Sequence, residues 1–326
     1  MIWANLAFIR FFLAWIVMCH HFRNIIPSSY FLSFFDKFDG FAAVLSFLVI
    51  SGFSIAHSIS KRSQKFYQRR LMRIYPLYIF SIFLAFIPFL PIVHSLMSSE
   101  LSHIDRPTLS NVIGNIFGSQ TFVVFPLSSN GAVWSLGVEF FCYLLAPLLM
   151  KLRTRQILSL IAISAACYLL FPALQIVQIK NLPYSRFGFP FLMLFWAWLL
   201  GFFYFFNHKR LAAKILLVCL GCVAIGMYDR ESLAIFTYIL TTITLIWSAS
   251  KNNNFTLPGR VLRAFNYLGE LSYPLYLFHV PLIPIILALT RSKEPLTLIL
   301  SSILFSMLVY HLIDVPIRHR KKLISS

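Results

Sequence analysis

The stretch ANLAFIRFFLAWIVMCHHF, residues Ala4–Phe22, is apolar over nearly its whole length. A helix needs about 20 such residues to cross the hydrocarbon core of a bilayer. Comparable stretches are centred on 41–58, 74–94, 133–150, 157–173, 187–206, 211–228, 232–249, 268–289 and 295–315. The sequence therefore predicts an all-α integral membrane protein with about ten transmembrane helices.

The composition excludes a soluble protein. Of the 326 residues, 59% are hydrophobic and 12% are charged, whereas about a quarter of the residues of soluble domains are charged. The net charge of +18 would suit a nucleic-acid-binding protein if the basic residues shared one face, but they lie between apolar stretches, so we expect no nucleic-acid partner. We expect residues 1–326 to form a single polytopic domain, and the cysteines to pack in the core rather than form a disulfide or metal site.

The basic residues also predict the orientation. They gather in alternate loops, beginning with Lys61–Arg73, and cytoplasmic loops carry an excess of Lys and Arg. Both termini are then cytoplasmic. Residues 111–127 are apolar enough that hydropathy alone would predict an eleventh transmembrane helix. That helix would invert the charge balance of all the loops that follow, so we expect a re-entrant or outer-surface segment instead.

Arg10, His21 and Glu139 are ionisable residues inside the predicted spans, where such groups usually serve function. Arg10 and His21 are eleven residues apart, which places them on one helix face, about 16 Å apart, and predicts that they line one cavity. In the alternative interpretation, Arg10 reaches the headgroups and the histidine lies at the interface. Glu139 must be neutral or paired, and we expect a histidine or arginine from another span as its partner, either for catalysis or as structural pairing.

Further polar residues inside the spans are spaced to share helix faces. Ser135 precedes Glu139 by one turn, and Ser272, Tyr276 and His279 form one stripe; a lone His279 is also typical of a hydrogen-bonded core residue. Arg69, Arg70 and Arg73 precede the third span. They predict either a topology signal in contact with anionic lipids or a site for a cytoplasmic phosphorylated ligand.

Six motifs follow one another in order along the chain: Arg10 with His21, FLVISGF (47–53), FYQRRLMRIYPLY (66–78), WSLGVEFFCY (134–143), SYPLYLFHVP (272–281) and IDVPIR (313–318). Together they resemble the acyltransferase-3 family of membrane-bound O-acyltransferases. Many members carry a fused extracytoplasmic domain, which we do not expect here. Asp314 stands where the family commonly has glutamate, which leaves the role of that position open.

The resemblance implies a function and a site. Family members of the bacterial inner membrane transfer an acyl group, usually acetyl from acetyl-CoA, to a hydroxyl of lipopolysaccharide O-antigen, capsule or another glycan, which can be lipid-linked. Acetyl-CoA would be a co-substrate, with no tightly bound cofactor and no metal. His21, Arg10 and Glu139 would be catalytic, Arg69, Arg70 and Arg73 would face the donor, and Trp134, Ser135, Tyr276 and His279 would support them.

The residues suit this chemistry. A sugar hydroxyl needs a general base near neutral pH, and histidine is the natural choice. The phosphates of coenzyme A should stay at the inner face against the arginines. A proton-coupled transporter would also place His, Glu and Arg in its spans, although we find none of the inverted repeats typical of that class. The sequence leaves open direct transfer or an acyl-enzyme.

Overall fold

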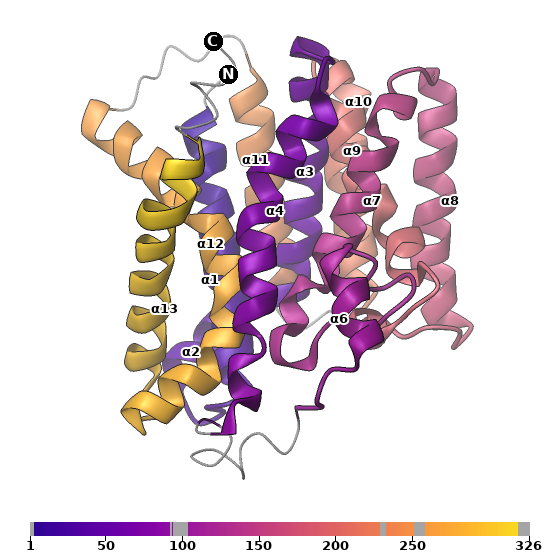
Figure 1. Ribbon diagram of the computed structural model, residues 1–326. Coiled ribbons are helices and arrows are strands. Elements are labelled where there is room, and N and C mark those ends of the chain that lie inside the picture. Colours follow the sequence, from indigo (N-terminus) through magenta and orange to yellow (C-terminus); the bar gives the residue numbers. More distant parts are fainter. Residues whose placement is uncertain (1–2, 92, 94–103, 229–232, 251–257, 319–326) are drawn as a thin grey trace.

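The computed structural model describes residues 3–91, 93, 104–228, 233–250 and 258–318. Across these ranges the chain is built from helices and the loops between them, and only an isolated bridge joins Gln120 to Val124. Figure 1 shows the long helices running roughly parallel to one another in a single bundle. The prediction of an all-α integral membrane protein is confirmed.

Among the described residues, eight helices are long and apolar enough to cross a membrane. They are α1 (Trp3–Arg23), α3 (Gly40–Lys61), α4 (Phe66–Leu84), α7 (Trp134–Leu149), α8 (Thr154–Ala173), α9 (Phe189–Asn207), α12 (Gly259–Thr290) and α13 (Pro295–Val309). Short 3-10 helices extend α4 and α7, namely η1 (Ile87–Phe89) and η2 (Ser128–Val133), and the π-helix η4 (Tyr310–Asp314) extends α13.

Two shorter apolar helices complete the predicted pattern, α10 (Leu211–Gly226) and α11 (Ala234–Ala249), each of 16 residues. At 1.5 Å per residue they are about 24 Å long, less than the hydrocarbon thickness of about 30 Å. All ten predicted stretches therefore coincide with helices, of which eight meet the length of a full crossing.

The apolar segment at residues 111–127 does not form a crossing helix. It contains α6 (Leu109–Ile116), whose eight residues are too few to cross, and the loop that carries the Gln120–Val124 bridge. The chain then returns to the end of α4, where Ser129 Oγ donates to the Ala85 carbonyl at 2.7 Å. The segment therefore enters and leaves at one side, as the charge pattern indicates.

Close helix contacts fix the centre of the bundle. A Cβ added at Gly52 of α3 would lie 1.9 Å from the Trp198 carbonyl oxygen of α9, and one added at Gly201 of α9 would lie 1.9 Å from the Val49 carbonyl oxygen of α3. Small residues let helix backbones approach in this way. On the other side of α3, α1 packs against α12 with Gly269 beside Ala7. Helices α1, α3 and α12 thus surround the region where the polar residues gather.

Two further differences concern the ends of elements. Helix α4 begins at Phe66 rather than near residue 74, so Arg69, Arg70 and Arg73 lie on its first turns and not in the preceding loop. The remaining short elements, α2 (Tyr30–Asp36) and η3 (Ile179–Tyr184), lie in connections between the long helices. The start of α1 and the end of η4 lie at the same end of the bundle as the end of α3, and α2 lies at the opposite end (Figure 1).

Candidate active site

Two cavities enter the bundle from its two ends. The first, the arginine cavity, has a volume of about 570 Å³ and is lined by Trp3, Arg10, Lys61, Arg70, Glu139 and Arg318, among others. The second, the histidine cavity, has a volume of about 490 Å³ and is lined by His20, His21, Asp39, Trp134, Lys180 and Tyr228, among others. Helix α3 lines the first from Lys61 to Val44 and the second from Val44 to Gly40. Its length of about 32 Å between Lys61 and Gly40 matches a bilayer core of about 30 Å.

The arginine cavity carries an excess of positive charge. Seven cationic side chains line it, Arg10, Lys61, Arg62, Arg69, Arg70, Arg73 and Arg318, against the two carboxylates of Glu139 and Glu270. Such a cavity concentrates an anionic ligand, since its low-dielectric walls focus the field of its charges.

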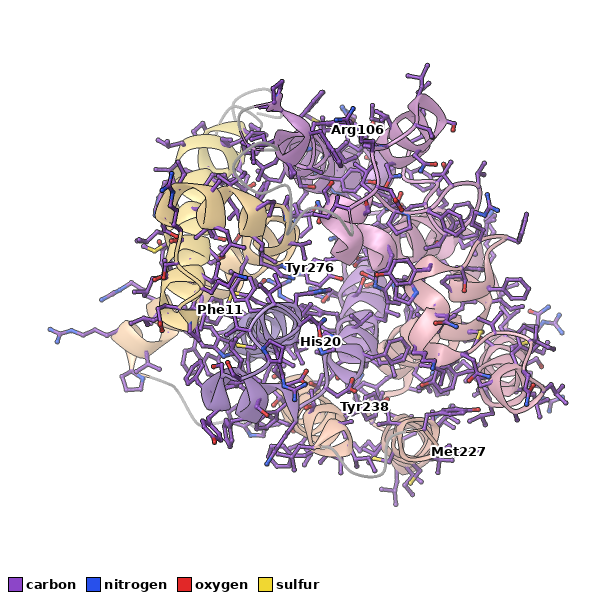
Figure 2. All side chains as sticks on the ribbon, turned by 90° about the horizontal axis from the view of Figure 1, so that it is seen from below. Phe11, His20, Arg106, Met227, Tyr238 and Tyr276 are labelled. Atoms are coloured by element: carbon purple, nitrogen blue, oxygen red, sulfur yellow. The ribbon has the colours of Figure 1, made fainter. Side chains whose placement is uncertain are left out.

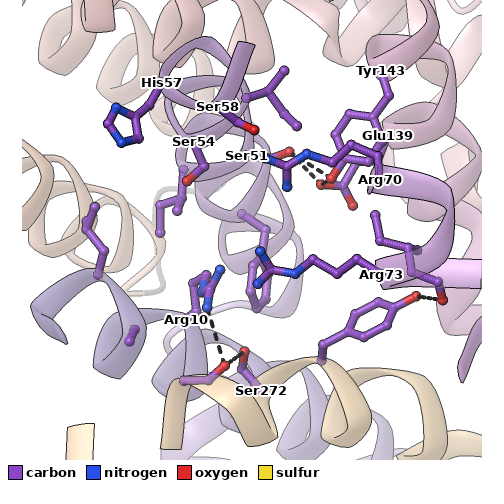
Figure 3. Close-up of a pocket in the computed structure, with 18 of the residues that line it drawn as sticks. Arg10, Ser51, Ser54, His57, Ser58, Arg70, Arg73, Glu139, Tyr143 and Ser272 are labelled. Atoms are coloured by element: carbon purple, nitrogen blue, oxygen red, sulfur yellow. Dashed lines mark hydrogen bonds between the residues drawn. The ribbon is translucent and has the colours of Figure 1, made fainter. Parts of the chain in front are cut away.

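Two of these arginines have few partners of their own. The Arg10 guanidinium makes one long hydrogen bond, to the Gly269 carbonyl at 3.4 Å, and its buried Nε has no partner among the described residues. Arg73 likewise makes no hydrogen bond and no ion pair with any of the described residues. Figure 3 shows both guanidinium groups pointing into the cavity. Their N–H groups are free to bind a phosphate or another anion.

The predicted donor-binding arginines all line this cavity, but they do not share one role. The Arg69 guanidinium donates to the backbone carbonyls of Arg62 and Gln64 and so holds the turn between α3 and α4. Arg70 lies over the Phe66 ring, 6.0 Å from its centroid, and its guanidinium approaches Glu139 in Figure 3. Arg70 and Arg73 are therefore the better placed of the three to meet a ligand.

Glu139 is satisfied by hydroxyl groups. Its Oε1 accepts a hydrogen bond from Ser51 Oγ at 2.5 Å and another from the Tyr143 hydroxyl, while Trp198 Nε1 donates to Ser51 Oγ at 3.3 Å. Among the described residues no histidine or arginine forms a hydrogen bond or ion pair with this carboxylate, and the two hydroxyls are its bonded partners; of the expected kinds of partner, Arg70 of α4 interacts with it through its charge. Sequence reasoning missed both, although Ser51 lies in FLVISGF and Tyr143 is one helical turn after Glu139.

Arg10 and His21 share a face of α1, as predicted, because both contact α12: Arg10 bonds Gly269 and the His21 ring lies 5.2 Å from that of His279. The prediction that they line one cavity is wrong. Arg10 lines the arginine cavity and His21 lines the histidine cavity. The physical reason is that side chains of α3 and α12 fill the space between them.

A second histidine faces His21. His279 is fully buried, and its Nδ1 lies 3.0 Å from the Leu275 carbonyl. A carbonyl can only accept, so Nδ1 carries the proton and Nε2 is left as an acceptor; this nitrogen has no partner among the described residues. The predicted supporting residue His279 therefore lies against the predicted base.

His20 points to a different neighbour. Its Nδ1 lies 2.6 Å from Asp36 Oδ1 of α2, and Arg23 donates to Asp36 Oδ2 at 3.0 Å. Partial burial alone would raise the pKa of Asp36, but the hydrogen bond from His20 and the charges of His20 and Arg23 outweigh it and lower that pKa below its ordinary value. His20 is thus tied to α2, whereas His21 faces His279.

The other predicted supporting residues meet at the point between the cavities. The Tyr276 hydroxyl lies 2.7 Å from Ser135 Oγ and donates to the Ala132 carbonyl at 2.9 Å. Trp134 stacks on Phe41, with ring centroids 6.3 Å apart and planes 4° apart. Tyr276 and Val44 line both cavities.

The last sequence motif contributes Arg318 to the lining of the arginine cavity. Arg318 Nε donates to Asp314 Oδ1 at 2.9 Å, and its Nη1 also bonds Glu270 of α12. The π-helix η4 carries Asp314, four residues before Arg318. Asp314, whose role the sequence left open, therefore holds Arg318 in place.

Comparison with known proteins assigns the family. No curated protein and no solved structure matches this chain. The family model described as an acyltransferase domain matches residues 3–313, nearly the whole chain. That match covers all ten apolar helices and every lining residue of both cavities except Arg318, so the chain belongs to the acyltransferase-3 family and is a membrane acyltransferase.

Proposed function

We propose that this protein transfers an acetyl group from cytoplasmic acetyl-CoA to a hydroxyl of a cell-surface carbohydrate, such as lipopolysaccharide O-antigen, capsule or exopolysaccharide, in the bacterial inner membrane. The observation that carries the proposal is the meeting of two cavities of different character at Val44 and Tyr276. One is rich in arginine and the other contains His21. A donor and an acceptor that approach from opposite sides would meet there.

The arginine cavity is the donor site in this proposal. Coenzyme A carries several phosphate charges, which Arg73, Arg10 and Arg70 would bind through charge-assisted hydrogen bonds. The pantetheine arm would extend along α3 towards Ser135 and Tyr276, which line the deep end of the cavity. The mouth of this cavity, at Lys61 and Arg318, faces the cytoplasm, in keeping with the excess of basic residues there.

The histidine cavity is the acceptor site. Its lining combines the stacked rings of Phe41 and Trp134 with the polar side chains of Asp39, Gln178 and Lys180. Sugars present apolar ring faces together with hydroxyl groups that both donate and accept hydrogen bonds, so this combination suits a sugar ring. A lipid-linked glycan would approach from the surrounding membrane lipids.

The chain's own residues supply the acid–base step. His21 accepts the proton of the acceptor hydroxyl as its oxygen attacks the thioester carbonyl carbon; a carbon–oxygen bond forms and the carbon–sulfur bond breaks. The proton then passes from His21 to the leaving thiolate, which gives free CoA and the acetyl ester. The His279 ring beside His21 limits the orientations open to the base.

Purified protein in lipid nanodiscs tests the proposal. With [14C]acetyl-CoA and a glycan extract of the source cell envelope, we expect label in the glycan and release of CoA thiol. Label in the glycan that is equal with and without the protein would refute the function. The His21→Ala protein serves as the matched control, because it should bind CoA without transferring the acetyl group.

A further inference from the structure

The boundary between the two cavities is made by a small number of side chains. Tyr276 of α12 and Val44 of α3 line both cavities. Tyr276 is 7% exposed and Val44 is 6% exposed. Figure 2, a view along the bundle, shows Tyr276 near its middle. These two side chains separate the arginine cavity from the histidine cavity.

The Tyr276 side chain is held firmly in this position. Its hydroxyl is bonded on both sides, to Ser135 and to the Ala132 carbonyl. Its ring meets the edge of Phe47, with centroids 5.7 Å apart and planes at 68°. Phe47 lies less than one turn along α3 from Val44 and lines the arginine cavity. Three apolar surfaces, those of Val44, Phe47 and the Tyr276 ring, therefore lie beside the Ser135 hydroxyl at the deep end of the arginine cavity.

We propose that Val44 and Tyr276 determine which acyl group the enzyme accepts. The inference rests on the proposed function, in which the acyl end of the donor reaches the deep end of the arginine cavity. There the carbonyl group must approach the histidine cavity, so the acyl chain must fit between Val44, Phe47 and Tyr276. Packed interiors tolerate little extra volume, so we expect these side chains to admit a short acyl group only.

The position of His21 supports this assignment. His21 lines the histidine cavity beyond Tyr276, and its neighbour His279 has a ring centroid 6.0 Å from that of Tyr276. An acyl group that stops at Val44 and Tyr276 thus reaches the boundary of the cavity that contains the base. A longer chain would hold its carbonyl farther back, on the arginine side. The same two residues would therefore select both the size of the acyl group and the position of its reacting carbon.

The proposal is tested by calorimetric measurement of donor binding, which needs no acceptor. CoA, acetyl-CoA, propionyl-CoA and butyryl-CoA share the nucleotide and the arm and differ only in the acyl group. One misplaced methylene in an apolar pocket changes discrimination by about 10–200-fold. We expect the wild-type protein to bind acetyl-CoA at least about tenfold more tightly than butyryl-CoA, and Val44→Ala to reduce that ratio to within about threefold.

Matched variants separate size selection from other effects. Val49 is buried on the same helix but lines neither cavity, so Val49→Ala should keep the wild-type ratio. Tyr276→Leu should relax the ratio, whereas Tyr276→Phe, which keeps the ring, should retain it. Val44→Ile enlarges the side chain and should weaken the binding of acetyl-CoA relative to that of CoA. Because this substitution adds volume, its effect cannot come from a cavity left in the protein.

The outcomes distinguish this inference from the proposed function. If neither CoA nor any acyl-CoA binds, the donor assignment fails. If CoA and acetyl-CoA bind but the acetyl-to-butyryl ratio is close to one, or is the same in Val44→Ala, Tyr276→Leu and the wild type, then the size-selection inference is overturned while the donor site stands.

Discussion

Replacing Arg73 with Ala should weaken CoA binding without destabilising the free protein. Within the described residues Arg73 has no hydrogen bond or ion pair to lose, and its guanidinium points into the arginine cavity together with that of Arg10 (Figure 3). A hydrogen bond to a charged group contributes about 1.5–3 kcal/mol, and each 1.4 kcal/mol is tenfold in Kd. Loss of one phosphate contact therefore predicts CoA binding about 10- to 150-fold weaker.

The stability of the free protein provides the second half of this prediction. Removing Arg73 takes one positive charge away from Arg10 when no anion lies between them, so the melting temperature should stay the same or rise, as at other sites where function costs stability. Arg69→Ala should behave differently, since the Arg69 guanidinium bonds the Arg62 and Gln64 carbonyls. That variant should lose thermal stability as well as affinity.

Calorimetry with CoA measures the affinity, and thermal unfolding of the same nanodisc samples measures the stability of the free protein. Arg155 is exposed on α8 and lines neither cavity, so Arg155→Ala is the control for a general loss of positive charge. Wild-type CoA affinity in the Arg73→Ala protein would refute the reasoning. So would an affinity loss accompanied by an equal loss of stability in the absence of CoA, because Arg73 would then be structural.

Four further outcomes are expected. His21→Ala should reduce acetyl transfer by about 10²–10⁴-fold with unchanged CoA affinity, while His20→Ala, whose side chain is tied to Asp36, should retain most activity in the same thiol-release assay; equal losses would contradict the assignment of the base. Glu139→Gln can still accept the hydrogen bonds of Ser51 and Tyr143 but lacks the negative charge, so we expect a folded protein with impaired transfer, and native transfer rates would make Glu139 a structural residue only. Because the folded pKa of Asp36 is lowered, the contribution of Asp36 to stability is present above the unfolded pKa of about 3.9 and is lost as the pH falls through the folded pKa. Asp36→Asn should remove that part of the pH dependence of unfolding. An unchanged dependence would show that the α1–α2 contact is too exposed to contribute to stability. A membrane-impermeant maleimide should label Ser63→Cys and Ser28→Cys from opposite sides of the membrane, and labelling from one side would refute the orientation.

The fold could be predicted because a membrane imposes a length on every crossing helix. Each of the ten apolar stretches became a helix, and no tertiary information was needed to find them. The predicted ends were less accurate where a helix continues into polar sequence. Helix α4 starts at Phe66 and α12 at Gly259, whereas hydropathy placed their starts near 74 and 268. Polar residues on the first turns of these two helices line or flank the arginine cavity, and a prediction based on hydropathy does not include them in the helices.

The site could be predicted only in part. Arg10, His21 and Glu139 were identifiable because an ionisable residue within an apolar span is costly. Which groups pair with which depends on contacts between helices that one sequence does not reveal. Ser51 reaches Glu139 from α3 and His279 reaches His21 from α12, and both helices are distant in sequence from their partners. The motifs contained residues that line the cavities, but they did not indicate the division of these residues between two cavities.

In the proposed mechanism, that division gives Arg10 and His21 separate tasks. A general base must be neutral before it accepts a proton, and a cation close to it would oppose the charge that it gains. A single cavity holding both residues would place the arginines proposed to bind phosphate beside the proposed base. In the structure Val44 and Tyr276 stand between them, so the arginines can bind an anionic donor without opposing protonation of His21. In the proposed mechanism, the spacing of about 16 Å along α1 holds the charged donor and the acid–base residue apart, and only the uncharged end of the donor has to reach the boundary.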